Sequence, residues 1–377
     1  MDEAVARLST NSARVAIVLP PGEAFAPAAS GAIGLMVHRL AAPTARFAPL
    51  VLGAETALPR YPDVPFLPVG QRRWPPLGFK AAYAACVLAT LGDLRPALVE
   101  VHNQPELAVR VAARLGGAKV VLFLHNDPQG MRGGRSARTR AALLTRLAGI
   151  VTVSHFLRAR LLDGLPPQPP GKVGVLPNAI DLASLPPALA PASREPLILF
   201  AGRLVADKGA DAFVAACARA LPALTGWRAM MIGADRFGPT SPETAFLRDL
   251  RRAAGRAGVA LSGYRPHGEV LESMARAAIV VVPSRWQEPF GLAALEAMAS
   301  GAALICSPRG ALPELAGDAA LYADPGDPTE LPAAITLLAT DPERRAALAR
   351  AGIERARAFD LPQATAALDA WRAELLA

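Results

Sequence analysis

Two glutamates, Glu288 and Glu296, stand eight residues apart in the segment 284–299, which reads SRWQEPFGLAALEAMA. The β-branched run 278–282 before it predicts a buried parallel strand. From Gly291 onward, apolar residues at helical spacing predict a helix. Glu288 therefore lies in the loop at the end of the strand, and Glu296 lies about a turn and a half into the helix.

The N-terminus of this predicted helix adds a potential phosphate-binding site between the two glutamates. The free N–H groups and the positive dipole end of a helix N-terminus attract phosphate, and here they lie between the two carboxylates. Carboxylates accept hydrogen bonds from hydroxyl groups. The arrangement suits a ligand with a diphosphate in its middle and hydroxyls at both ends, which describes a nucleotide sugar.

A second segment offers positive charge. The apolar run 197–201 predicts a buried strand, and GRLVADKG follows at 202–209. Arg203 supplies a planar fork of donors and Lys208 a point charge. Together they can neutralise a departing nucleoside diphosphate without a metal ion.

Both segments resemble signatures of one enzyme family. The spacing of Glu288 and Glu296 resembles the E-x7-E signature of retaining glycosyltransferases, and the residues between them, Phe290, Gly291 and Leu292, narrow the resemblance to glycosyltransferase family 4. The resemblance implies that Glu288 contacts the donor hexose during catalysis and that Glu296 holds the ribose hydroxyls. It also implies that Phe290, Gly291 and Leu292 line the donor site.

The basic segment resembles the family's G-R-L-x-x-x-K-G motif, which implies that Arg203 and Lys208 bind the donor diphosphate. Gly263-Tyr264-Arg265 is similar to the family's loop beside the base, so Tyr264 and Arg265 are expected to bind the donor. The resemblance implies no metal and no cofactor other than the nucleotide sugar, which acts as co-substrate.

The resemblance also implies the fold. It is an α/β fold of the GT-B type, with two Rossmann-like domains that face each other across a cleft. We expect an acceptor-binding domain at 1–184, a nucleotide-sugar domain at 197–358 and a helix at 359–377 that crosses back to the first domain. The proline-rich stretch 185–196 is the expected linker.

Apolar runs alternate with helical patterns along the chain, as in parallel βαβ sheets. The predicted strands are 14–19, 49–53, 66–69, 97–102, 119–125 and 150–153 in the first half, and 197–201, 229–232, 259–262, 279–282, 303–306 and 320–322 in the second.

The first half carries candidates for the acceptor side. Gly31 follows the first strand where the family has a glycine-rich loop near the donor phosphates, although Ala32 replaces the usual second glycine. His125 ends the strand 119–125, where the family commonly has a histidine near the transferred sugar. The surrounding residues resemble a subgroup that acts in bacterial cell-surface polysaccharide and spore-coat glycosylation.

Four further residues are expected at the acceptor. His102 and Asn103 end a neighbouring strand and are predicted to line the acceptor pocket, since ligands bind at the carboxyl ends of parallel strands. Arg132 and Arg135 follow His125 in a polar loop and are predicted to meet a phosphate of the acceptor.

The charge is unevenly distributed. Residues 1–190 contain 20 Lys and Arg against 11 Asp and Glu, whereas residues 191–377 contain 20 against 21. A strongly positive half predicts an anionic partner, either a lipid-linked acceptor or the anionic inner membrane, for which Arg72, Arg73 and Lys80 are candidates. An arginine-rich composition is the alternative explanation. No nucleic-acid motif is visible.

A length of 377 residues suits two domains. Three scattered cysteines, Cys86, Cys217 and Cys306, indicate a reducing compartment. No apolar run reaches the roughly 20 residues that a membrane helix needs, and no signal peptide is recognised. The prediction is a cytoplasmic protein, with peripheral contact to the cytoplasmic face of the inner membrane as a further expectation.

The function that follows is retaining transfer of a hexosyl unit from a nucleoside diphosphate sugar to a saccharide acceptor, lipid-linked or free, in lipopolysaccharide or exopolysaccharide assembly. The alternatives are a GT-B phosphorylase or epimerase and a non-catalytic nucleotide-sugar-binding partner. A phosphorylase of this fold needs a pyridoxal lysine, and none of the four lysines stands in a suitable setting.

Overall fold

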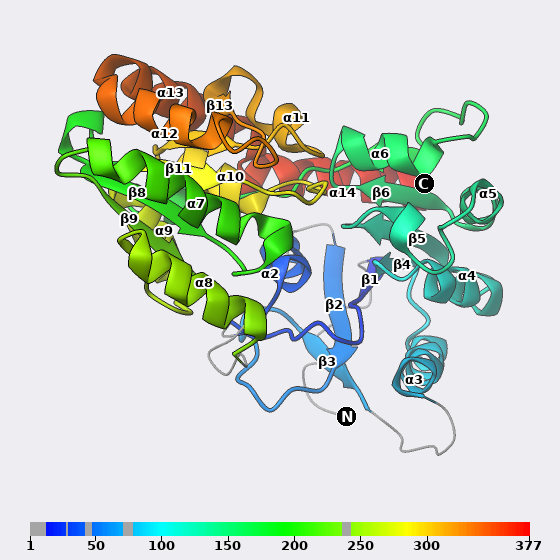
Figure 1. Ribbon diagram of the computed structural model, residues 1–377. Helices are drawn as coiled ribbons and strands as arrows, with labels where there is room; N and C mark the ends of the chain where they lie inside the picture. Colours follow the sequence, from blue (N-terminus) through cyan, green and yellow to red (C-terminus); the bar gives the residue numbers. More distant parts are fainter. Residues whose placement is uncertain (1–12, 28, 42–46, 71–77, 236–242) are drawn as a thin grey trace. The chain divides into compact units, whose positions relative to one another are not determined.

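The computed structural model describes residues 13–377 except 28, 42–46, 71–77 and 236–242 (Figure 1). The chain divides into two compact units. The first unit comprises Met1–Ala179 and Leu361–Ala377, and the second comprises Ile180–Asp360. The division therefore falls a few residues before the proline-rich stretch 185–196, which lies inside the second unit.

A parallel sheet of seven strands forms the centre of the first unit, in the order β3-β2-β1-β4-β5-β6-β7. The chain moves outward from β1 to one side and from β4 to the other, so the sheet has a switch point between these two strands. The strands are β1 (Ala13–Val18), β2 (Phe47–Ala54), β3 (Phe66–Val69), β4 (Leu98–His102), β5 (Lys119–Leu124), β6 (Gly149–Thr152) and β7 (Val173–Val175).

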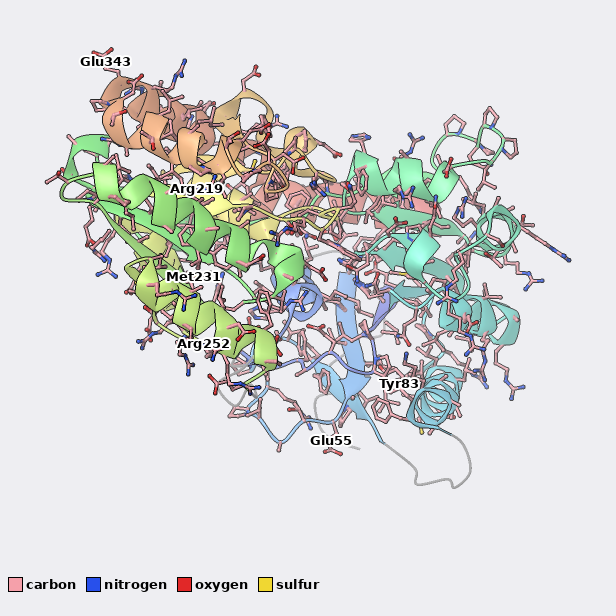
Figure 2. All side chains as sticks on the ribbon, viewed as in Figure 1. Glu55, Tyr83, Arg219, Met231, Arg252 and Glu343 are labelled. Carbon is pink, nitrogen blue, oxygen red and sulfur yellow. The ribbon has the colours of Figure 1, made fainter. Side chains whose placement is uncertain are left out.

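Helices cover both faces of this sheet. One buried cluster joins it to α3, α4, α5 and α6, and another joins it to α2 and α14. Tyr83 on α3 is fully buried and donates its hydroxyl hydrogen to the carbonyl of Leu19 at 2.8 Å (Figure 2). The helices are α2 (Ala32–Leu40), α3 (Phe79–Leu94), α4 (Pro105–Arg114), α5 (Ala137–Arg146), α6 (His155–Leu162) and α14 (Leu361–Leu376).

The second unit contains a parallel sheet of six strands in the order β10-β9-β8-β11-β12-β13. Its switch point lies between β8 and β11. The strands are β8 (Glu195–Ala201), β9 (Arg228–Ile232), β10 (Val259–Leu261), β11 (Ala277–Val282), β12 (Ala303–Cys306) and β13 (Ala320–Tyr322). The helices are α7 (Ala210–Ala220), α8 (Ala245–Arg256), α9 (His267–Arg276), α10 (Leu292–Ala299), α11 (Leu312–Ala316), α12 (Glu330–Thr340) and α13 (Pro342–Ala356).

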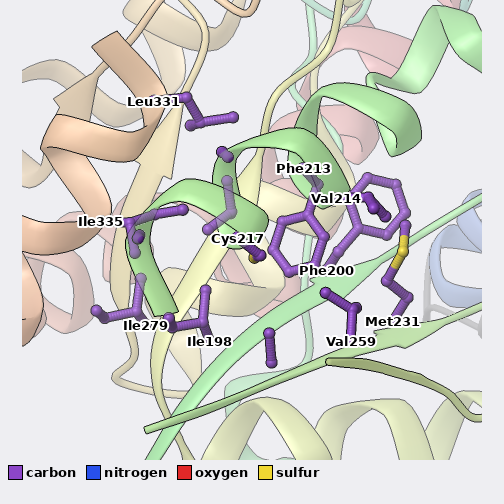
Figure 3. Packing of buried hydrophobic residues seen from close by; sticks show 14 of the residues in the cluster. Ile198, Phe200, Phe213, Val214, Cys217, Met231, Val259, Ile279, Leu331 and Ile335 are labelled. Carbon is purple, nitrogen blue, oxygen red and sulfur yellow. The ribbon is translucent and has the colours of Figure 1, made fainter. Parts of the chain in front are cut away.

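The core of the second unit explains why these strands hold together (Figure 3). Phe200 of β8 packs at 5.6 Å from Phe213 of α7, measured between ring centroids. Met231 of β9, Ile279 of β11 and Ile335 of α12 belong to the same buried cluster. Apolar side chains on alternate strand positions are thereby removed from water, which is the main stabilising term in such a sheet.

The predicted α/β architecture with two parallel sheets is confirmed, and each predicted strand is present. The strand β7 was not predicted, because its three residues, Val-Gly-Val, are too short for a periodic signal. Among the helices that the described residues form, none combines the length and the hydropathy that a membrane-spanning segment needs. Arg72 and Arg73 lie outside the described residues, whereas Lys80 lies in the first turn of α3.

Candidate functional site

Two loops flank the switch point of the second sheet. The loop 202–209 follows β8 and the loop 283–291 follows β11. In open parallel sheets a ligand binds in the crevice between such loops, at the carboxyl edge where the strand order reverses. Both predicted donor-binding motifs therefore lie at the position where this fold can bind a ligand.

A glycine brings the two loops into contact. Gly209 has φ = 71°, and a Cβ atom there would lie 1.8 Å from the carbonyl oxygen of Pro283. Only glycine fits such a position. The carbonyl of Asp207 accepts hydrogen bonds from the amides of Arg285 and Trp286 at 2.9 and 3.0 Å. The loop after β8 is thus fixed against the loop after β11.

This contact places Lys208 beside Glu288. The Lys208 Nζ atom lies 2.6 Å from Glu288 Oε1, although the residues are 80 positions apart in the chain. The Glu288 side chain is 7% exposed and that of Lys208 is 28% exposed. A nearly buried carboxylate requires such a partner, because an unpaired charge in this place would cost several kcal/mol.

A third loop, which follows β12, supports Glu288 from its backbone. Gly310 has φ = 64°, and a Cβ atom there would lie 2.3 Å from both the amide nitrogen and the carbonyl oxygen of Glu288. The Ala311 amide donates to the Glu288 carbonyl at 2.8 Å. The Gly310 amide donates to Gln287 Oε1 at 2.8 Å. The position of Glu288 is therefore set by three separate strand ends.

The second glutamate has a partner that the sequence did not indicate. Glu296 is buried on α10, and its Oε1 lies 2.8 Å from Nε2 of His267, the first residue of α9. The family resemblance ended at Arg265 and gave His267 no role. The available signal was its place at a helix start, directly after the loop that follows β10.

The residue before helix α10 is its N-cap, Gly291, which has φ = 105° and supplies no capping side chain. The side chain of Phe290 is buried and packs edge-on against Phe359, with ring centroids 5.7 Å apart. Phe290 therefore fixes the loop by packing within the unit. Leu292, the first residue of α10, is half-buried.

The other predicted donor residues stand at the same sheet edge. Arg203 and Tyr264 follow β8 and β10 and are half-buried. Arg265 is exposed and lies 3.8 Å from Glu269. These three side chains are closer to solvent than Glu288 and Glu296, which are both buried.

In the first unit, two histidines meet at the carboxyl edge. His102 ends β4 and His125 follows β5, and the distance from His102 Nδ1 to His125 Nε2 is 2.9 Å. Their ring centroids are 5.0 Å apart, and His102 also stacks on Phe123 at 4.7 Å. The sequence predicted these histidines as separate contacts, whereas the structure joins them into one pair.

Burial keeps both rings neutral near pH 7. It lowers the pKa of His125 to about 4. Burial also lowers the pKa of His102, and the neighbouring His125 and Arg372 lower it further. Asn103 adopts φ = 56°, a conformation that asparagine tolerates, and its Oδ1 accepts the amide hydrogen of His125 at 2.9 Å.

Arg132 and Arg135 stand apart from the histidine pair. The Arg132 side chain is 85% exposed and lies 2.8 Å from Glu106. Arg135 is exposed, and its carbonyl accepts a hydrogen bond at 3.1 Å from the buried Arg140. Arg140 also donates to the carbonyl of Gly134 at 3.2 Å, so it fixes this loop through backbone oxygens.

The predicted glycine-rich loop lies against the side-chain carboxylate of Glu23. The amide of Gly34, in the first turn of α2, donates to Glu23 Oε1 at 2.8 Å. Burial raises the pKa of Glu23, and hydrogen bonds from the Gly34 and Gly31 amides oppose that rise. A Cβ atom on Gly31 would lie 3.1 Å from this carboxylate. The N-terminus of α2 therefore already holds a carboxylate where a donor phosphate was expected to approach.

Comparison with known proteins gives two family matches. The family described as "Glycosyl transferases group 1" matches residues 184–355, and the one described as "Glycosyltransferase Family 4" matches residues 35–184. The D-inositol 3-phosphate glycosyltransferase of Segniliparus rotundus is 31% identical over 200 residues, which cover 50% of this chain and 44% of that protein. The glycogen synthase of Mycobacterium tuberculosis is 30% identical over 281 residues, with 70% and 66% coverage. The chain spans about half the length of the first of these curated relatives.

Solved structures share the fold over nearly the whole chain. Sucrose-phosphate synthase from Thermosynechococcus elongatus superposes with a TM-score of 0.76 at 20% identity, covering 96% of this chain and 98% of that one. Anabaena Alr3699/HepE in complex with UDP-glucose gives 0.72 at 18% identity, with 93% and 97% coverage. WaaG, described as a glycosyltransferase involved in lipopolysaccharide biosynthesis, gives 0.67 at 19% identity, with 94% and 98% coverage. At these identities the likeness establishes the fold, and the predicted GT-B fold is confirmed.

Proposed function

Because the chain belongs to glycosyltransferase family 4, we propose that it transfers a hexosyl unit from a nucleoside diphosphate sugar to a saccharide acceptor with retention at the anomeric carbon. One observation carries the proposal: the ion pair between the half-buried Lys208 and the nearly buried Glu288 stands at the switch point of the second sheet. A cation for phosphate and a carboxylate for hydroxyls are thereby held 2.6 Å apart at the edge where this fold binds ligands.

The donor would span the start of α10. Its diphosphate would meet the backbone N–H groups that Gly291 leaves without a capping side chain, together with Lys208 and Arg203. Glu296, held by His267, would accept hydrogen bonds from the ribose hydroxyls. Glu288 would accept hydrogen bonds from hydroxyls of the hexose.

Donor binding would exchange one ionic partner for another. In the structure the ammonium group of Lys208 is hydrogen-bonded to Glu288. The incoming diphosphate would replace Glu288 as the partner of Lys208, and the sugar hydroxyls would replace Lys208 as the partner of the carboxylate. Each buried group keeps a hydrogen-bonding partner throughout, which limits the cost of the exchange.

The reaction needs no protein nucleophile. The bond from the anomeric carbon to the diphosphate oxygen breaks, and a bond to the acceptor oxygen forms on the same face of the sugar. The acceptor hydroxyl proton passes to the departing diphosphate. Lys208 and Arg203 would stabilise the charge that develops on the leaving group, which lowers the barrier only to the extent that they hold it more tightly in the transition state.

We also propose a lipid-linked saccharide acceptor in lipopolysaccharide or exopolysaccharide assembly. The support is the positive first unit, where α4 packs on α5 and α5 on α6, and where exposed arginines gather on these helices. They include Arg110, Arg114, Arg138, Arg146 and Arg158. Such a surface attracts phosphate groups of lipids and of lipid-linked sugars.

The test is mass-spectrometric detection of transfer or hydrolysis with a panel of nucleotide sugars. UDP-glucose is the first donor to test, because the related HepE structure contains it. Glu288→Gln should abolish turnover of the donor that works, whereas Glu343→Gln, an exposed glutamate on α13, should leave it unchanged.

The panel also separates the alternatives. Phosphate-dependent release of a sugar 1-phosphate would identify a phosphorylase, and interconversion of nucleotide sugars would identify an epimerase. Binding of a nucleotide sugar without turnover, in the presence of saccharide acceptors, would identify a non-catalytic partner. Each of these outcomes contradicts the proposed transfer.

A further inference from the structure

The histidine pair of the first unit adjoins a buried ion pair. Glu100 and His102 are two residues apart on β4 and therefore face the same side of the sheet, the side that α14 covers. Arg372 of α14 donates from Nε and Nη2 to both oxygens of Glu100, at 2.7 and 2.9 Å. Arg372 also lies 3.5 Å from Asp369.

When both rings are neutral, the hydrogen bond between them contains one hydrogen, which is covalently attached to one ring or to the other. With both imidazoles uncharged, either His102 Nδ1–H donates to His125 Nε2, or His125 Nε2–H donates to His102 Nδ1. The first arrangement leaves a lone pair on His102 Nε2 and a hydrogen on His125 Nδ1. The second leaves a hydrogen on His102 Nε2 and a lone pair on His125 Nδ1.

The environment of His102 Nε2 decides between the two. This atom is buried and has no hydrogen-bond partner among the residues that the structure describes. A buried N–H without a partner is rarer in proteins than an acceptor without one. The positive charge of Arg372 disfavours a second proton on His102, so the ring stays neutral and Nε2 has no hydrogen when Nδ1 has one.

A small cavity favours the same arrangement. Its volume is about 20 Å³, room for one water molecule, and His102, His125 and Arg372 are among its lining residues. A water held between Arg372 and His102 would accept a hydrogen bond from the guanidinium group, which can only donate. It would then donate to a lone pair on Nε2.

We infer that His102 is a positioning residue that donates from Nδ1 to His125 and thereby holds His125 in the Nδ1–H tautomer. His125 then presents a hydrogen-bond donor, and no basic nitrogen, at the carboxyl edge of the first sheet. It can hold an oxygen of a sugar but cannot remove a proton through Nδ1. The inference rests on the proposed function only where it assigns this donor to a saccharide.

The protonation of the ring nitrogens can be read directly. The chain has five histidines, so a nitrogen NMR spectrum of protein with ¹⁵N-labelled histidine resolves a small number of ring signals. Single substitutions assign them, and His155→Gln, at an exposed position on α6, is the matched control. We expect protonated Nδ1 and unprotonated Nε2 on His125 at pH 7. The opposite tautomer on His125 would overturn the inference.

Two variants of His102 extend the test. His102→Phe keeps the stacking on Phe123 and removes the donor, so His125 should revert toward the Nε2–H tautomer that free histidine prefers. Asn carries an amide donor near the position of Nδ1, so His102→Asn should restore the Nδ1–H tautomer of His125. A His125 tautomer that stays the same in His102→Phe would show that His102 does not set it.

The same variants are then assayed for transfer. His102→Phe should lower kcat/KM roughly tenfold, the effect of about one net hydrogen bond, and His102→Asn should recover most of it. Loss of activity in both variants, with His125 in the native tautomer in His102→Asn, would contradict the positioning role. A wild-type protein without transfer activity would overturn the proposed function, while the nitrogen spectrum would still decide the tautomer.

Discussion

Arg372 and Glu100 are 272 positions apart, yet their side chains form two hydrogen bonds and are 1% and 2% exposed. This bidentate pair attaches the C-terminal helix α14 to the central strand β4 of the first unit. Trp371 beside it forms a T-shaped ring contact with Phe123, with ring centroids 6.1 Å apart. The last helix is therefore part of the core of the first unit.

We predict that Arg372→Met destabilises the first unit by about 3–5 kcal/mol, because Glu100 is left buried without its partner. The double variant Glu100→Leu with Arg372→Met should recover much of that loss. Arg146→Met, at an exposed position on α5, is the control. Thermal and urea unfolding measure all three, and equal stability of Arg372→Met and the control would show that the pair contributes nothing.

Gly209 offers a second test, because it joins two loops of the candidate site. In Gly209→Ala the new methyl group would meet the Pro283 carbonyl and push Lys208 away from Glu288. Gly226→Ala is a matched control, since Gly226 also has positive φ, 81°, with no atom within 4 Å of its Cβ position. In the control, only the backbone strain of alanine at positive φ should lower the free energy of unfolding, by about 1–2 kcal/mol.

Gly209→Ala should lose more stability than this control and should also lose affinity for nucleoside diphosphate. Urea unfolding and calorimetric titration of both variants provide the comparison. If the two alanine variants bind nucleotide equally well, the contact between the loops does not organise the site.

The histidine pair predicts how stability depends on pH. The pKa of His125 falls from an ordinary 6.5 to about 4 on folding, so between these values the unfolded chain binds a proton that the folded chain does not. The free energy of unfolding therefore decreases as the pH falls from 6.5 to 4, by up to about 3 kcal/mol. The pKa of His102 is lowered as well, which adds to the same slope. Urea unfolding between pH 7 and 4.5 should show a shallower slope for His102→Phe than for the wild type, and parallel slopes would contradict the prediction.

The basic helices of the first unit predict binding to anionic vesicles. Each Arg near such a surface contributes on the order of 1 kcal/mol, screened over about 8 Å at physiological salt. The double variant Arg138→Glu with Arg146→Glu should reduce co-sedimentation more than tenfold at low salt. Arg252→Glu, on α8 of the second unit, should not (Figure 2). Binding that does not depend on lipid charge, or no binding by the wild type, would contradict the prediction. The surplus of positive charge in the first half would then reflect only the arginine-rich composition.

Much of the fold was predictable from local pattern. A fully buried parallel strand such as β11 is a continuous apolar run, so Ala277–Val282 is recognisable without knowledge of its neighbours. Parallel strands end at one edge, so Lys208 after β8 and Glu288 after β11 could be expected at the same edge of the sheet. The short β7 could not be recognised, because the pairing of Val173–Val175 with β6 defines it more than its own residues do.

The contacts within the site were not predictable, because they depend on distant parts of the chain. The Lys208–Glu288 bond requires the close approach of Gly209 to Pro283, which no local pattern reveals. The pairing of Glu296 with His267 depends on the packing of α10 against α9. Such geometry arises from tertiary packing, which the periodicity of the sequence does not predict.

The central claim is that the two carboxylates of the second unit have different partners in the donor. Calorimetric titration of nucleoside diphosphate into Glu296→Ala and Glu288→Ala tests it most directly. Glu296→Ala should weaken binding by about 1.5–3 kcal/mol, the range for a hydrogen bond to a charged group, because the ribose loses its acceptor. Glu288→Ala should bind the nucleotide as well as the wild type or better, since Lys208 is released from its ion pair, yet it should fail to transfer sugar. Equal losses of nucleotide affinity in the two variants would contradict the account.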